Sequence, residues 1–251
     1  MSFIYSRIRR NSLLFTVIAL LGLLGLSTTA LQAQSYTHYN NIDQMSGWGS
    51  CDVCSGPGGN GAPIPHWMAQ FQTTPSTDGA SMQFFVGGTA SYGSALFNKQ
   101  LGANDNVRHF SLSLDFYFSN QNGPQAIEID TWQSVNGHRY LFGAECDIKG
   151  TYAGLWMVND FANNKWVSTG IPCLAATAGK WHHIVWEYSR TLGNQMNYQA
   201  VTVDGVKKMV NRIYSPHSTT NRELNIAIQL DGDKTMTDYS IWVDRVNLTA
   251  W

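Results

Sequence analysis

The chain has 251 residues, with 16 Lys and Arg against 17 Asp and Glu, which gives a formal net charge of −1. This balance provides no basic footprint, so we expect no nucleic-acid partner. The length suits a single all-β domain, and few charged residues with nine Trp favour an extracellular β-rich protein with a surface for ligand stacking.

The N-terminal segment has the pattern of a secretory signal peptide. Three arginines precede an apolar run from Leu13 to Leu26, and small residues lead to cleavage after Ala33, with Ala30 as the alternative. The run is short for a membrane span. Cleavage after Ala33 removes three Arg and no acidic residue, which leaves a net charge of −4. We therefore predict a signal peptide over 1–33 and one domain over 34–251. The protein would be secreted, periplasmic or extracellular, monomeric, and without a membrane partner.

Four cysteines remain in the mature chain: Cys51, Cys54, Cys146 and Cys173. An even number in an exported protein favours disulfides. The sequence does not choose among the pairings, and we favour Cys51–Cys54, which share a Gly-rich loop, with Cys146–Cys173. The CxxC spacing also occurs in zinc and redox sites, but a thioredoxin-like βαβ context is missing.

Apolar residues alternate with polar ones along most of the mature chain, which is typical of half-buried strands. In chain order, the predicted strands cover 82–86, 110–118, 125–133, 138–146, 153–159, 184–188, 196–203, 225–230 and 239–248. Asp204-Gly205 predicts a hairpin turn. About ten strands without a long amphipathic helix indicate an all-β fold of two stacked antiparallel sheets.

One strand carries a motif that suggests chemistry. The segment from Glu128 to Gln133 reads Glu-Ile-Asp-Thr-Trp-Gln. On a regular strand Glu128, Asp130 and Trp132 share one face, while Ile129 and Thr131 face the core. Two carboxyl groups on one face disfavour joint ionisation, so we expect one of them to have a raised pKa.

This hexapeptide resembles the Glu-x-Asp-x-x-Glu strand of the laminarinase–lichenase family, with Gln133 in place of the acid/base Glu. The segments 181–188 and 201–205 resemble the "WHHV…VDG" hairpin of laminin-G-like domains, and 239–246 is similar to the last strand of the same superfamily. The resemblance covers roughly 80–251. It implies a concanavalin-A-like jelly-roll sandwich whose concave face forms a glycan cleft.

The resemblance also implies roles for the motif. Glu128 would be the nucleophile, Asp130 would tune its ionisation, and Gln133 would occupy a degenerate acid/base position, because an amide cannot protonate a leaving group. In a regular strand Gln133 would face the core, whereas a β-bulge would return it to the carboxylate face. An acid from another strand could restore hydrolysis; the candidates are Glu145, Asp147, Glu187 and Asp231.

Further side chains are candidates for substrate binding: Trp132, Trp48, Trp67, His138, Arg139, Tyr140, Glu145, Glu187, Gln229 and Asp231. Trp48 and Trp67 could line a cleft edge or plug one end of the sandwich. His138 or Tyr140 could serve as the base of a lyase. Trp156, Trp186 and Trp242 fall on core-like phases. No cofactor is firmly indicated; Asp231-Gly232-Asp233 could bind a structural calcium ion or simply form a turn.

We weigh four functions. We prefer a secreted glycan-binding protein that holds a polysaccharide or oligosaccharide. The first alternative is an endo-acting glycoside hydrolase on a β-glucan-like polysaccharide, with Glu128 as nucleophile and an acid from another strand; a polysaccharide lyase is the second. An adhesion module with an accidental glycosidase-like strand is the remaining reading. Whether the protein is an enzyme stays open, with hydrolase ahead of lyase.

Overall fold

The computed structural model describes residues 34–52, 64–173 and 178–251. The predicted signal peptide therefore lies outside the described residues, as does Cys54. Within the described part, no helix is both long enough and apolar enough to cross a membrane.

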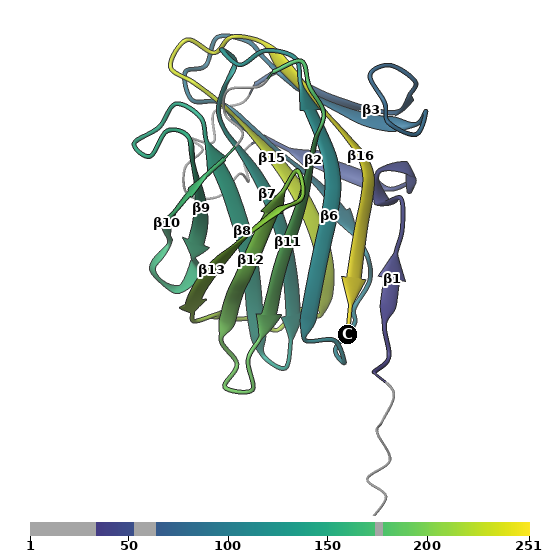
Figure 1. Ribbon diagram of the computed structural model, residues 1–251, viewed down its shortest axis with the longest axis vertical. Coiled ribbons are helices and arrows are strands. Elements are labelled where there is room, and N and C mark those ends of the chain that lie inside the picture. Colours follow the sequence, from purple (N-terminus) through teal and green to yellow (C-terminus); the bar gives the residue numbers. More distant parts are fainter. Residues whose placement is uncertain (1–33, 53–63, 174–177) are drawn as a thin grey trace, which may run out of the picture. The chain divides into compact units, whose positions relative to one another are not determined.

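Two antiparallel sheets of eight strands each make up the fold (Figure 1). Sheet A has the order β13-β12-β11-β6-β16-β4-β3, with β1 paired to β16. Its strands are β1 (Thr37–Tyr39), β3 (His66–Gln72), β4 (Ser81–Val86), β6 (His109–Phe118), β11 (His182–Arg190), β12 (Met196–Val203), β13 (Val206–Tyr214) and β16 (Tyr239–Ala250).

Sheet B has the order β10-β9-β8-β7-β15-β5-β2, with β14 paired to β8. Its strands are β2 (Trp48–Cys51), β5 (Ser94–Gln100), β7 (Pro124–Val135), β8 (His138–Asp147), β9 (Leu155–Asp160), β10 (Lys165–Pro172), β14 (His217–Ser218) and β15 (Glu223–Gly232). Two short 3-10 turns, η1 (Ile42–Gln44) and η2 (Phe161–Asn163), complete the elements. The predicted all-β class with two stacked antiparallel sheets is confirmed.

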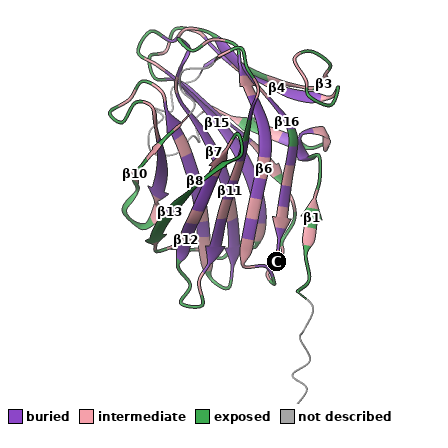
Figure 2. Ribbon diagram, viewed as in Figure 1, coloured by how far each residue is buried: buried purple, intermediate pink, exposed green. Residues whose placement is uncertain are grey.

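The core lies between the sheets and follows the alternation in the sequence. Along β6, the five apolar residues Phe110, Leu112, Leu114, Phe116 and Phe118 are all buried, while most of the residues between them are half-buried (Figure 2). Facing strands meet through aromatic pairs: Phe142 of β8 stacks on Tyr188 of β11 with ring centroids 4.7 Å apart. Each fully buried side chain of this size contributes about 1.5–3 kcal/mol, so this layer is the main source of stability.

Two local predictions can be compared directly with the structure. Asp204 and Gly205 have φ values of 47° and 83°, and Val203 pairs with Val206 across them, which confirms the hairpin between β12 and β13. Trp242 differs from expectation: it is half-buried on the outward face of sheet A, edge-on to Tyr117. Its phase on β16 is that of the outward residues, because Ile241 and Val243 fill the core.

A disulfide joins Cys146 on β8 to Cys173, the residue that follows β10, which confirms that pairing. The sequence separation is 27 residues, and the bridged segment contains β9, η2 and β10. The bond therefore fixes the outer three strands of sheet B to one another at one end.

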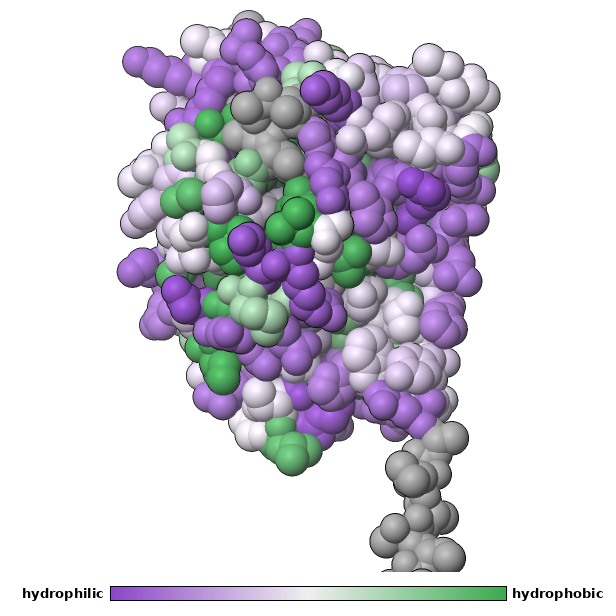
Figure 3. All heavy atoms as spheres, in the orientation of Figure 1, coloured by the Kyte–Doolittle hydropathy of each residue, from purple (hydrophilic) through white to green (hydrophobic). Residues whose placement is uncertain are grey.

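The face of the molecule in Figure 3 mixes hydrophilic residues with smaller hydrophobic patches.

Candidate functional site

Strand β7 lies in the middle of sheet B and presents Glu128, Asp130 and Trp132 on the outward face. The side chains between them point into the core, where the Thr131 hydroxyl bonds the Tyr188 hydroxyl. The pairing register places Glu128 opposite Glu145 of β8 on one side and opposite Gln229 of β15 on the other. Facing residues of neighbouring strands have Cβ atoms about 4.5–5.5 Å apart, so these three side chains form one row across the sheet.

Four acidic residues gather around this row: Glu128, Asp130, Glu145 and Asp231, which we call the carboxyl cluster. The amide nitrogen Nε2 of Gln229 donates to Glu128 Oε1 at 2.7 Å and to Asp231 Oδ1 at 3.1 Å. Among the described residues, no Lys, Arg or His forms an ion pair with any member. The cluster therefore depends on one amide and on its own protons for stabilisation.

The surroundings shift the ionisation of all four groups in one direction. Burial raises the pKa of Asp130 to about 8, and repulsion from Asp231 adds to it. Burial, again with repulsion from Asp231, raises the pKa of Glu145 to about 8. The pKa of Asp231 is raised by burial to about 7, and that of Glu128 lies well above its ordinary value, mainly because of burial. The cluster thus retains protons at neutral pH.

A pocket of about 240 Å³ opens beside the carboxyl cluster on the outward face of sheet B. Its lining combines aromatic, polar and acidic side chains, namely Leu96, Glu128, Asp130, Trp132, Arg139, Leu141, Asn159, Phe161, Trp166 and Gln229. A Cβ on Gly143 would lie 3.0 Å from Asp130 Oδ1 and 3.2 Å from Cη2 of Trp166. The absence of a side chain at Gly143 therefore lets the Trp166 ring lie close to the sheet beside Asp130.

Several buried polar atoms around this pocket have no hydrogen-bond partner among the described residues. They are Oδ1 of Asp130, Oδ1 of Asn159, Oε1 of Gln229 and Nε1 of Trp132. An unpaired buried polar atom costs about 1–3 kcal/mol. Such atoms gathered in one pocket are available to hydrogen-bond a ligand or water.

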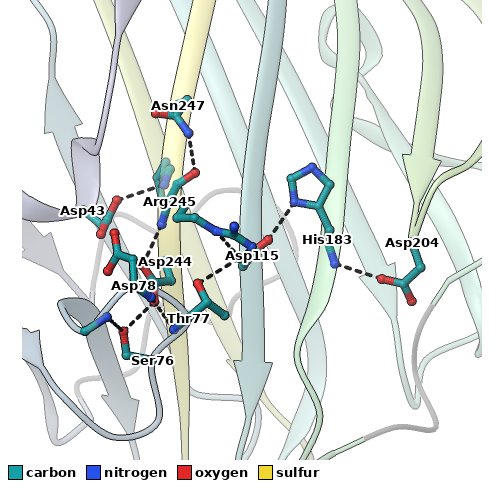
Figure 4. Close-up of polar contacts among 12 residues, drawn as sticks. Asp43, Ser76, Thr77, Asp78, Asp115, His183, Asp204, Asp244, Arg245 and Asn247 are labelled. Atoms are coloured by element: carbon teal, nitrogen blue, oxygen red, sulfur yellow. Dashed lines mark hydrogen bonds and ion pairs between the residues drawn. The ribbon is translucent and has the colours of Figure 1, made fainter.

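A second group of acidic residues, on sheet A, has the opposite character (Figure 4). Asp115 accepts hydrogen bonds from Arg245, from His183 at 2.7 Å and from Thr77 at 3.0 Å. Asp244 accepts from the Ser76 hydroxyl at 2.7 Å and from the backbone of the same loop. These carboxylates are paired and fasten a loop to β16. The carboxyl cluster of sheet B, in contrast, has few hydrogen-bond and ion-pair partners among the described residues.

The structure places Gln133 away from the pocket. The pairing of β7 with β8 runs without a shift from Ala126 to Val135, so no bulge returns Gln133 to the face of Glu128. Gln133 is buried between the sheets, where Nε2 donates to the backbone oxygens of Asn104 and Val107. A chemical role for it in the pocket has no geometric basis here.

Other candidates from the sequence separate into two groups. Trp132, Arg139, Gln229 and Glu128 line the pocket, and Glu145 and Asp231 stand next to it. The remaining candidates lie away from the pocket. Trp48 packs on Phe84, and Tyr140 is in the core with His138 beside it. On sheet A, Trp67 stacks on Phe85 and Glu187 pairs with Lys207. The two proposed lyase bases are therefore outside the pocket. Asp147 shares the outward face, but its carboxylate accepts from the backbone of Gly150 and Tyr152.

Residues that the sequence analysis did not single out supply one wall. Asn159 is the next-to-last residue of β9, Phe161 begins η2, and Trp166 belongs to β10, directly opposite Asn159 in the register. The run Asn-Asp-Phe-Ala-Asn-Asn before Lys165 is rich in turn residues. It could have indicated a hairpin that returns Trp166 beside the predicted strand 153–159.

Asp233 is one of the two residues suggested as calcium ligands, and both of its carboxylate oxygens have protein donors. Asp233 Oδ1 accepts from Thr235 and Met236, and its Oδ2 takes an ion pair with Lys149 at 2.6 Å. Its oxygens thus already have donors, as in an ordinary turn. In the described part of the chain, no group of three or more His, Cys, Asp or Glu is arranged to hold a metal ion.

Fold and site together define a two-sheet antiparallel sandwich with a pocket of mixed aromatic and acidic character on one outward face.

No protein-family model matches the chain, and no curated protein matches it. Among solved structures, it is similar to a carbohydrate esterase from Shiga toxin-encoding bacteriophage phi24B, with 14% identity and a TM-score of 0.49 over 86% of this chain and 99% of that one. It is also similar to the cellulose induced protein Cip1, with 9% identity and a TM-score of 0.49 over 80% and 90%. A sialidase shows 12% identity and a TM-score of 0.44 over 73% of this chain, which spans 18% of that enzyme. The pocket, and not these similarities, is the basis for the function proposed below.

Proposed function

We propose that the pocket on the outward face of sheet B binds a glycan. The observation that carries this proposal is the combination of aromatic rings with unpaired buried polar atoms in one pocket. A sugar ring has apolar C–H faces that stack on indole rings and hydroxyl groups that both donate and accept hydrogen bonds. Trp132, Phe161 and Trp166 offer the first kind of contact, and Gln229 and Asn159 offer the second. A pocket of about 240 Å³ is smaller than the roughly 300–1,000 Å³ of a drug-sized ligand site, which suits a single sugar unit of a longer chain.

The test is binding by the purified protein to a panel of β-glucans, xylans, galactans and uronates, followed by calorimetry with the best ligand. Trp166→Ala should weaken binding about tenfold, the equivalent of about 1.4 kcal/mol. Trp67→Ala is the matched control, because it removes a more exposed indole, 44% accessible, from the other sheet. Equal affinities for Trp166→Ala and the parent protein, or no binding to any glycan, would remove the basis for the proposal.

A second candidate function is glycoside hydrolysis, favoured by the register of β7 and β8. Glu128 and Glu145 face each other, and retaining glycosidases hold their two carboxyl groups about 5–5.5 Å apart. Glu145, with a pKa raised to about 8, suits the acid. Glu128 would have to be ionised to act as a nucleophile, and burial opposes this. Binding therefore ranks ahead of catalysis. New reducing ends that disappear in both Glu128→Gln and Glu145→Gln would reverse that order.

A further inference from the structure

The charges around the sheet B pocket indicate which kind of ligand group the pocket would stabilise. Four carboxyl groups share this face, and in the described part of the chain no Lys, Arg or His forms an ion pair with them. Arg139 lines the pocket, but it pairs with Glu223 at 3.0 Å, and Lys149 pairs with Asp233 at 2.6 Å. Repulsion within the cluster contributes to the raised pKa of Glu128, Asp130 and Glu145. A positive charge placed in the pocket would therefore be stabilised by several neighbours at once.

The unpaired polar atoms provide an independent observation. Gln229 is 1% exposed, and its orientation is set because Nε2 already donates to two carboxyl groups, which leaves Oε1 as an acceptor without a partner. Asn159, 3% exposed, likewise has an unpaired Oδ1, and both residues line the pocket. Against the two unpaired amide acceptors stands one unpaired donor, Nε1 of Trp132, and Asp130 Oδ1 becomes a further acceptor when its carboxyl group loses its proton. The missing partner is consequently rich in donors.

The aromatic rings that line the pocket, Trp132, Phe161 and Trp166, also favour a cationic group that donates hydrogen bonds. An ammonium group has three donors and no acceptor, and cations are attracted to the faces of Trp and Phe rings within about 6 Å. We propose that the pocket binds the protonated amine of an amino sugar, such as a glucosamine unit of a de-N-acetylated chitin-type oligosaccharide. This inference rests on the proposed glycan binding and deepens it by naming the ligand class.

Binding of an ammonium group also changes the protonation of the cluster. A cation favours ionised carboxylates, so binding releases protons from the cluster to the solvent, whereas a neutral sugar leaves them in place. The ionisable groups on this face are Glu128, Asp130, Glu145, Asp147 and Asp231, together with the pairs Arg139–Glu223 and Lys149–Asp233. The lining residues from β5, β9, η2 and β10 are not ionisable, but the imidazole of His217 stacks on the Phe161 ring with centroids 4.1 Å apart. Proton release is attributable to the carboxyl cluster where it persists in His217→Gln.

The experiment is calorimetry on the purified protein with tetramers of glucosamine, N-acetylglucosamine and glucose, at pH 6.5 in two buffers of different ionisation enthalpy. We expect the glucosamine tetramer to bind at least tenfold more tightly than the other two. We also expect protons to pass to the buffer, and affinity to fall with added salt. Asp130→Asn should reduce binding of the glucosamine tetramer at least tenfold. Glu187→Gln, on the other sheet, is the control and should bind as the parent does.

The two proposals fail in different ways. Equal or tighter binding of the acetylated or glucose tetramer would overturn the amino-sugar inference and leave glycan binding standing. Binding of glucosamine without proton release would also overturn it, because the cluster would then not be the partner of the amine. No binding of any tetramer, or of the polysaccharides in the wider panel, would overturn the proposed function itself.

Discussion

Asp130→Asn should make the protein more stable at neutral pH, because the native side chain is buried and has no ion pair with any described residue. Its pKa is raised from 3.8 to about 8. Between these values the folded protein holds a proton that the unfolded chain releases. Stability from this group is therefore fully present at low pH and is lost as pH rises toward 8. The slope is about 1.4 kcal/mol per pH unit, so the loss between pH 5 and pH 7.5 is about 3 kcal/mol.

The assay is urea unfolding followed by Trp fluorescence at pH 5 and pH 7.5. The asparagine amide stands in for the protonated acid, so the variant should already be more stable than the parent by about 2 kcal/mol at pH 5, because the unfolded aspartate ionises above pH 3.8. At pH 7.5 the variant should be more stable by about 5 kcal/mol. Glu187→Gln, whose glutamate is paired with Lys207 on sheet A, should show no such pH-dependent gain. If the difference between Asp130→Asn and the parent does not change between the two pH values, the reasoning on the carboxyl cluster is refuted.

Three further changes test other parts of the structure. Gly143→Ala should weaken glycan binding at least tenfold by calorimetry, because its Cβ would lie 3.0 Å from Asp130 Oδ1 and 3.2 Å from Trp166. An unchanged affinity would show that this contact does not shape the pocket. Cys173→Ser should lower the free energy of unfolding by about 3.5 kcal/mol in urea, from the entropy of opening the loop, and a change near zero would contradict that estimate. Phe142→Ala, in the core between the sheets, should cost about 3–5 kcal/mol, and a cost below about 1 kcal/mol would show that the ring is not packed as described.

Strand positions were predictable where apolar and polar residues alternate. The pattern from Phe110 to Phe118 fixed β6 because one face of that strand fills the core. The alternation fails at β13, whose residues are mostly exposed at the edge of sheet A. It also fails at β10, which lies at the edge of sheet B. An edge strand with little buried surface needs no regular apolar face, so its sequence carries a weak signal.

The site was predictable only within one strand. The shared face of Glu128, Asp130 and Trp132 follows from the two-residue period of a strand. The position of Gln133 could not be decided from sequence, since it depended on a bulge that the register of β7 does not contain. The approach of Gln229 to Glu128 joins residues about a hundred positions apart in the chain. Such contacts depend on which strands become neighbours, and periodicity carries no information about that.

The disulfide between Cys146 and Cys173 has a consequence for how tightly the pocket can hold a ligand. The segment that it closes supplies Asn159, Phe161 and Trp166, one whole wall of the pocket. A wall on an unrestrained edge hairpin would lose conformational entropy each time a ligand ordered it. With the covalent link, the conformational entropy of this segment is lost during folding and not on binding. The wall is therefore preorganised before the ligand arrives. Reduction of this one bond should therefore speed ligand release more than it slows capture.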